Sequence, residues 1–255
     1  MYLRLCLLGW YIILPGSCKQ AEIHDLHALS EIDPHLLLRD GEKLFQYWEI
    51  QEQDQLWGLE TGEVGAIDAY AKDLKEALGN DAFTITLGKE QSQKEQLEAY
   101  TRFDTINNYD LVHEGYLGKI RKINFIEAQI LNYQLNRFPL FSHPTEFHGF
   151  IAKHDSLGLI RIYFAASDQP FPPKPGIIIE HLEQAIENGW YLKYHLHNHY
   201  EPDSNNYVGA MAPSLADAQY FKMLKERFAL NEALITNGFN TVVLKNNEFE
   251  KFNSH

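Results

Sequence analysis

The chain is short of cysteine and of basic residues. Its 255 residues include only two cysteines, too few for a disulfide framework. Lys and Arg together number 22 against 35 Asp and Glu, so the formal net charge is −13. Binding to nucleic acid or to an anionic membrane surface needs clustered Lys and Arg. The sequence therefore predicts binding to neither nucleic acid nor an anionic membrane surface. It also lacks an internal repeat, which argues against a solenoid.

Long apolar runs are also scarce, and the one present lies at the amino terminus. Residues 5–14 are almost wholly apolar, follow Arg4 and precede Pro15-Gly16-Ser17-Cys18. This order is typical of a signal peptide, and the run is shorter than the roughly 20 apolar residues of a membrane span. A buried helix is the alternative, but a wholly apolar terminal helix broken by Pro-Gly would be a poor core element. We expect residues 1–17 to be removed on export.

Cys18 stands at the expected cleavage point and resembles the lipidated cysteine of a bacterial lipobox. Gly16 and Ser17 suit the preceding positions, whereas Pro15 occupies a place where an aliphatic residue is usual. Cleavage nearby with a free Cys18 thiol is the alternative. The resemblance predicts an exported lipoprotein of the periplasm or cell surface, whose contact with the membrane is a lipid on Cys18.

The remaining chain divides into two regions. Residues 18–115 read as mostly helical, and no group of side chains in them suggests chemistry. Residues 116–138 fit a strand or a helix equally well. In residues 116–255, periodicity and turn residues predict an α/β fold with a mixed sheet flanked by helices. The expected elements are strands at 147–152, 159–166, 190–197, 233–235 and 241–244, and helices at 177–188 and from Ser214 to about 228.

The segment from His195 to His199 has the pattern His-Leu-His-Asn-His at the end of an expected strand. Strand alternation places His197 and His199 on one face, with His195 one step deeper. Neutral imidazole is a common metal ligand, and catalytic zinc usually has three protein ligands and a water. With Ser214 as N-cap, Asp217 falls in the first helical turn and could be the third ligand. Taken alone, however, Ser-x-x-Asp is also a capping-box variant, and a lone His-x-His occurs by chance.

Three segments together resemble the JAB/MPN metallopeptidase domain, also called the JAMM domain, including its RadC branch. They are Glu146-Phe-His-Gly149, His197-Asn-His199 and Ser214-Leu-Ala-Asp217, and the resemblance covers about residues 115–250. It implies a layered fold like that of cytidine deaminases. It also implies that His197, His199 and Asp217 bind zinc, that Glu146 is the general base and that Ser214 stabilises the oxyanion. The implied reaction is hydrolysis of a peptide or isopeptide bond.

The chain departs from that family in two respects. Fourteen residues separate His199 from Ser214, and this segment is longer than is usual in the family. It could form a lid or a substrate-selecting loop, or it could disturb the site. The best-known members act inside cells, so an exported enzyme needs another peptide or protein substrate. The alternatives are a catalytically silent binding module of the bacterial envelope, or hydrolysis of another kind of bond. His195 would orient a metal ligand from behind, be a substitute ligand or be a hydrogen-bonded core histidine, and His148 would line the cleft.

Overall fold

A computed structural model describes residues 29–53, 55–58, 72, 103–138, 143–199, 210–238 and 240–254. The predicted signal peptide, Cys18 and the segment between His199 and Ala210 lie outside the described residues, so those predictions stay open. Within the described ranges, no helix has the length and apolar character needed to cross a membrane.

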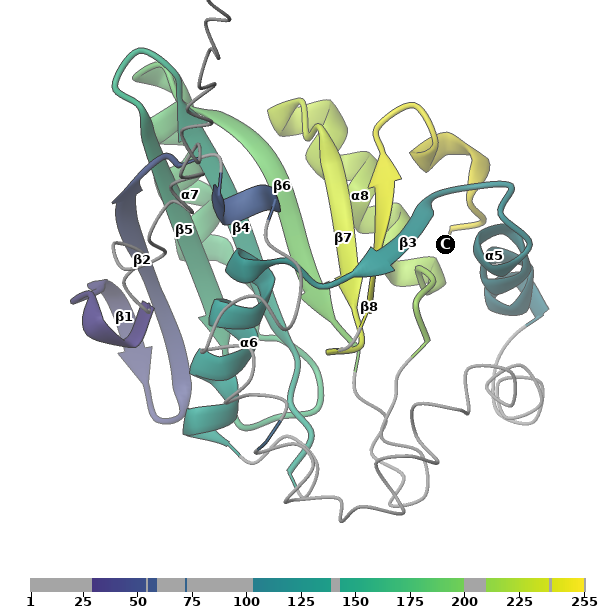
Figure 1. Cartoon of the computed structure of the whole chain (residues 1–255), viewed down its shortest axis with the longest axis horizontal. Helices are drawn as coiled ribbons and strands as arrows, with labels where there is room; N and C mark the ends of the chain where they lie inside the picture. Colours follow the sequence, from purple (N-terminus) through teal and green to yellow (C-terminus); the bar gives the residue numbers. More distant parts are fainter. Residues whose placement is uncertain are drawn as a thin grey trace, which may run out of the picture.

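One mixed sheet of eight strands organises the described residues, in the order β1-β2-β5-β4-β6-β7-β8-β3 (Figure 1). Neighbouring strands are antiparallel except for β6 and β7, which run parallel. The α/β class is therefore confirmed. The strands are β1 (His35–Asp40), β2 (Lys43–Gln51), β3 (Lys119–Lys122), β4 (Phe147–His154), β5 (Leu159–Ala166), β6 (Tyr191–Asn198), β7 (Glu232–Thr236) and β8 (Asn240–Lys245).

Local chemistry explains the elements of the carboxy-terminal region. β4 and β5 form the expected hairpin, and the turn between them ends at Gly158 with φ of +62°. β7 and β8 pair across the Asn237-Gly238 turn, where Gly238 has φ of +88°. Glycine adopts such positive φ values without the steric cost that a Cβ atom imposes. The ambiguous segment 116–138 contains both elements: strand β3 and then helix α6 (Phe125–Arg137), which Asn124 caps.

Residues 35–51, which belong to the region predicted to be mostly helical, form two strands. β1 and β2 form a hairpin, and β2 pairs along its length with β5, so this part extends the same sheet. Trp48 on β2 is completely buried, with ring centroids 4.8 Å from Tyr133 of α6 and 5.9 Å from Phe164 of β5. Helices are described at α1 (Gln55–Gly58) and α5 (Phe103–His113). The predicted domain division at residue 115 stays a prediction.

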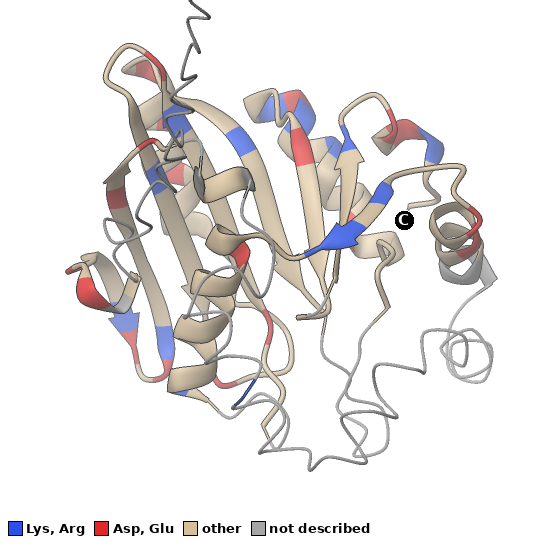
Figure 2. Ribbon diagram, in the orientation of Figure 1, with Lys and Arg blue, Asp and Glu red and all other residues tan. Residues whose placement is uncertain are grey.

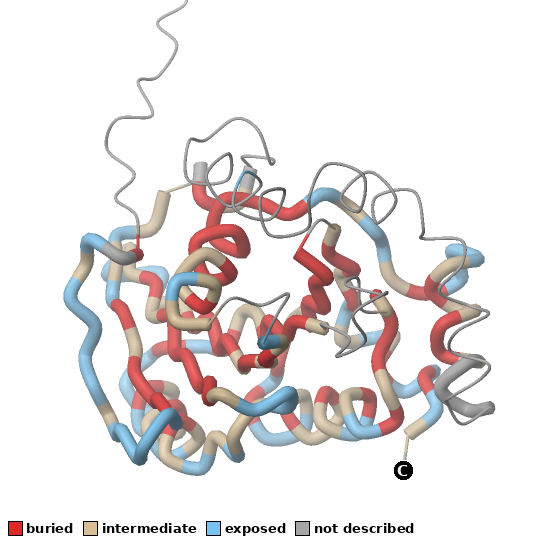
Figure 3. Tube along the Cα trace, turned by 90° about the horizontal axis from the view of Figure 1, so that it is seen from below, coloured by how far each residue is buried: buried red, intermediate tan, exposed pale blue. Residues whose placement is uncertain are grey.

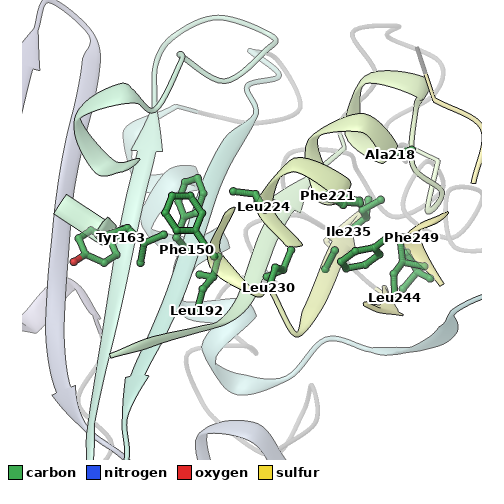
Figure 4. Close-up of a cluster of buried hydrophobic side chains, with 14 of the residues drawn as sticks. Phe150, Tyr163, Leu192, Ala218, Phe221, Leu224, Leu230, Ile235, Leu244 and Phe249 are labelled. Atoms are coloured by element: carbon green, nitrogen blue, oxygen red, sulfur yellow. The ribbon is translucent and has the colours of Figure 1, made fainter. Parts of the chain in front are cut away.

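Helices cover both faces of the sheet. α6 packs on one face, whereas α7 (Gly176–Glu187) and α8 (Leu215–Phe228) pack on the other (Figure 1). The burial-coloured trace shows the buried positions gathered between these layers (Figure 3). On the α7 and α8 side, one buried cluster contains Phe150 and Leu192 from the strands and Phe221 and Leu224 from α8 (Figure 4). This packing fixes where the first turn of α8 lies relative to β4 and β6.

A buried carboxylate joins α6 to β3 and β8. The side chain of Glu127 is 0% exposed and accepts two hydrogen bonds from Arg121, at 2.6 and 2.8 Å. It also accepts one from the Thr241 hydroxyl at 3.0 Å and one from the Asn124 backbone N–H at 2.9 Å. Basic residues lie along β3, which is one of the two edge strands of the sheet (Figure 2). Charge on an edge strand discourages pairing with further chains.

Gly118, which immediately precedes β3, packs tightly against side chains of β8. Gly118 has φ of +71°, and a Cβ atom built there would lie 2.6 Å from Leu244 Cδ2 and 2.9 Å from Val242 Cγ2. Both the backbone conformation and the space therefore require glycine at this position.

Candidate metal centre

Three segments that are distant in sequence meet at one end of the sheet. β6 lies between β4 and β7, with His197 directly opposite His148 of β4. His199 follows the end of β6, and its backbone N–H donates to the Thr236 carbonyl of β7 at 2.9 Å. Glu146 immediately precedes β4, and Asp217 is the third residue of α8. The structure thus brings together the four predicted residues: Glu146, His197, His199 and Asp217.

The distances among these side chains suit a small metal ion. His197 Nε2 lies 3.6 Å from Glu146 Oε2 and 3.7 Å from Asp217 Oδ1, and His199 Nε2 lies 3.3 Å from Asp217 Oδ2. Tetrahedral zinc with bonds of about 2.0–2.2 Å would separate its ligand atoms by about 3.3–3.6 Å. Donor atoms of Glu146, His197 and His199 also lie within 4.8 Å of one another. Glu146, His197 and His199 could therefore hold a metal ion, and the carboxylate of Asp217 lies beside both imidazoles.

Hydrogen bonds orient both imidazoles toward the centre. His197 Nδ1 lies 3.0 Å from the Phe147 carbonyl, and His199 Nδ1 lies 2.6 Å from the Ala210 carbonyl. A carbonyl oxygen can only accept, so each Nδ1 carries a proton and each Nε2 points toward the carboxylates. Backbone carbonyls commonly orient metal-binding histidines in this way, which also makes the imidazole a better ligand.

Asp217 is both a capping residue and a candidate ligand. Its Oδ2 accepts from the Ser214 N–H at 2.9 Å and from the Ser214 hydroxyl at 2.7 Å, while its own N–H donates to Ser214 Oγ at 3.2 Å. The simpler capping-box interpretation is thus correct, and it is compatible with ligation because Oδ1 faces His197. The hydroxyl proton of Ser214 is directed at Asp217, so in this arrangement Ser214 orients the carboxylate.

Charges within the centre stabilise one another without a metal. Burial lowers the pKa of His199, but the hydrogen bond and charge of Asp217, together with Glu146, raise it to about 9. Burial would raise the pKa of Asp217, yet the bond to His199 and the neighbouring imidazoles hold it far below the ordinary range. Burial lowers the pKa of His197. The metal-free site therefore contains an ion pair between protonated His199 and ionised Asp217.

Asn198 is a positioning residue that the sequence analysis missed. Its side chain is buried; Oδ1 accepts from the Phe147 N–H at 2.7 Å, and Nδ2 donates to the Thr145 carbonyl at 2.9 Å. These bonds hold the backbone on both sides of Glu146. The sequence contained a feature that could have identified Asn198. Strand alternation turns the residue between two histidines toward the opposite face of the sheet, where a buried amide needs hydrogen-bond partners.

His148 and His195 form a second pair beside the centre. His148 Nδ1 lies 3.0 Å from His195 Nε2, and the His148 ring stacks on His197 with centroids 5.4 Å apart. Burial, followed by the nearby His197, lowers the pKa of His148 to about 3. Burial likewise lowers the pKa of His195 well below its ordinary value. His148 lines the cavity beside the centre, and His195 is its buried hydrogen-bond partner.

The centre opens into a cavity of about 490 Å³. Its lining combines charged and imidazole groups with the apolar side chains of Phe171 and Pro172. Phe171 is 65% exposed. The lining residues are Glu146, His148, Phe171, Pro172, His197, His199, Ser214, Ala216, Asp217 and Tyr220.

Comparison with known proteins adds no relative to this picture. No family model matches the chain, and the searches of curated proteins and of solved structures found no match. The resemblance to the JAB/MPN domain therefore stays a prediction from local motifs, and the function is argued from the site alone.

Proposed function

We propose that the protein is a zinc-dependent hydrolase of peptide or isopeptide bonds. The observation that carries the proposal is the convergence of two Nε2 atoms and two carboxylates at one cavity, at separations of 3.3–3.7 Å. Each imidazole is also held by a backbone carbonyl, which favours a built metal site over a chance cluster.

The residues divide into holding and reacting groups. His197, His199 and Asp217 would hold the ion, and two imidazoles with one carboxylate suit zinc best among common metals. When bound, zinc supplies a Lewis acid that lowers the pKa of a coordinated water to about 7. Glu146, with its side chain 19% exposed at the cavity, would accept a proton from water and later deliver it to the leaving amine. Ser214 orients Asp217.

The substrate would be a peptide or protein met outside the cytoplasm. This rests on the signal-like residues 1–17 and the lipobox-like Cys18, which predict an exported protein of the bacterial envelope held by a lipid. An acidic chain with a formal charge of −13 is poorly suited to nucleic acid. A peptide of the cell wall or cell surface would meet these conditions.

One observation favours a different function. The ion pair between His199 and Asp217 satisfies both groups without a metal, at 3.3 Å. A catalytically silent binding module of the envelope would retain this pair as a structural element. It would have no need for a general base at Glu146.

Metal analysis of the purified protein separates these functions. We expect about one zinc per chain, and none in a His197→Ala, His199→Ala double variant. A His154→Ala variant is the matched control, because His154 lies at the far end of β4 and bonds to the Asn188 carbonyl. If neither the parent nor the control binds zinc, even when it is supplied, the binding module is the better interpretation.

Glu146→Gln then tests the general base. We expect this variant to keep its zinc and to lose hydrolysis of peptides that the parent cleaves. Loss of zinc would instead identify Glu146 as a ligand in the place of Asp217. Unchanged hydrolysis would exclude Glu146 as the base.

A further inference from the structure

We infer that His148 presents an Nε2–H hydrogen-bond donor to the cavity, held in that tautomer by His195, and that this donor binds the carbonyl oxygen of the scissile amide. The tautomer follows from the histidine pair alone. The identity of the oxygen rests on the proposed hydrolase function.

The position of the proton follows from the burial of His195. This side chain is 1% exposed, its Nε2 lies 3.0 Å from His148 Nδ1, and its Nδ1 is buried with no hydrogen-bond partner among the described residues. A buried N–H without an acceptor is costly, whereas a lone pair without a donor is tolerated more readily. The proton of His195 is therefore on Nε2, which donates to His148.

The tautomer of His148 is then determined. Its Nδ1 accepts from His195, so its own proton is on Nε2. His148 lines the cavity, and its Nδ1 points at the buried His195. The ring nitrogen on the cavity side is therefore Nε2. Contacts with His197 and Tyr220, with ring centroids 5.4 and 5.2 Å away, hold the ring in place.

No other described side chain lining the cavity has a proton to offer at its surface. The Ser214 hydroxyl donates to Asp217, and the Nδ1 protons of His197 and His199 are directed at backbone carbonyls. The Nε2 proton of the protonated His199 is directed at Asp217. The Tyr220 hydroxyl oxygen lines no accessible surface, because it is buried. Ionised carboxylates only accept. His148 is thus the donor available to an acceptor atom entering the site.

The acceptor best matched to this donor is an amide carbonyl oxygen. When the oxygen of a water that has given its proton to Glu146 bonds to the carbonyl carbon, the C=O π bond breaks and its electron pair places a negative charge on the carbonyl oxygen. A preorganised neutral donor stabilises this charge more than it stabilises the starting carbonyl. His148 would therefore take the oxyanion role that the sequence resemblance implies for Ser214.

The tautomers can be measured directly by NMR on the full-length chain labelled with ¹⁵N-histidine. Long-range ¹H–¹⁵N correlations identify which ring nitrogen carries the proton, and His148→Gln and His195→Gln variants assign the signals. We expect Nε2–H on both His148 and His195. His197 is the internal control, because its bond to Phe147 predicts the opposite tautomer. An Nδ1–H on His148 would overturn the inference.

Kinetics test the role of the donor. On a peptide amide that the parent cleaves, we expect His148→Leu to lower kcat by about 10²- to 10³-fold with zinc content unchanged. His148→Gln, which retains an N–H, should lose less and guards against misfolding of the leucine variant. Equal kcat values for the parent and the two variants would refute the role. If the parent cleaves no amide, the hydrolase proposal fails, while the NMR result still decides the tautomer.

Discussion

The ion pair between His199 and Asp217 predicts that the metal-free protein loses stability as the pH rises above neutral. The pKa of His199 is about 9 in the folded protein, against an ordinary value of 6.5. The folded state therefore holds this proton more tightly than the unfolded state does. Stability from the pair is fully present below about pH 6.5 and is lost as the pH rises through about 9.

The magnitude follows from the two pKa values. At about 1.4 kcal/mol per pKa unit, the difference corresponds to about 3 kcal/mol of unfolding free energy. Little discount for solvent is needed, since the side chains of His199 and Asp217 are 14% and 17% exposed. A loss of this size is a large fraction of the stability of an ordinary domain.

Urea denaturation after treatment with a chelator measures the effect. Between pH 6 and about pH 9.5, we expect the parent to lose about 3 kcal/mol more than a His199→Gln variant, which cannot titrate there. A His154→Gln variant should follow the parent, because His154 is remote from the pair. Parallel pH dependence of the parent and His199→Gln would refute the ion pair. Zinc affinity should increase over the same pH range, because zinc binds the neutral imidazole.

Three further substitutions test other parts of the structure. Asn198→Ala should lower the unfolding free energy by about 2–4 kcal/mol, because two buried backbone groups lose their partners. It should also weaken zinc binding, because Glu146 is displaced. Urea denaturation measures the first effect and metal analysis the second. Glu127→Gln should cost about 2–4 kcal/mol by leaving the half-buried Arg121 without its charge partner; an unchanged denaturation midpoint would contradict the buried ion pair. Gly118→Ala should lower stability by about 1–3 kcal/mol through positive φ and crowding, and thermal unfolding with unchanged Tm would show that the backbone can relax.

Much of the carboxy-terminal half could be predicted from the sequence, because its signals are local. An apolar run predicted β4, and alternating apolar residues predicted β5. The Asn237-Gly238 turn predicted the last hairpin, and Ser214 predicted the start of α8. Each signal depends on residues within one turn or one strand, so no knowledge of the remaining chain is needed. The amino-terminal hairpin was missed because β2 becomes a strand through its pairing with β5, more than a hundred residues away.

The site shows the same division. From sequence alone, strand alternation placed His197 and His199 on one face, and the cap placed Asp217 in the first turn of a helix. Only the tertiary structure brings Glu146 to within 3.6 Å of His197, directs the Ser214 proton at Asp217 and pairs His148 with His195 at 3.0 Å. Periodicity determines which way a side chain points within its own element. Which atoms meet depends on the order of strands in the sheet and on the packing of α8 against it, and those arise from contacts between residues distant in the chain.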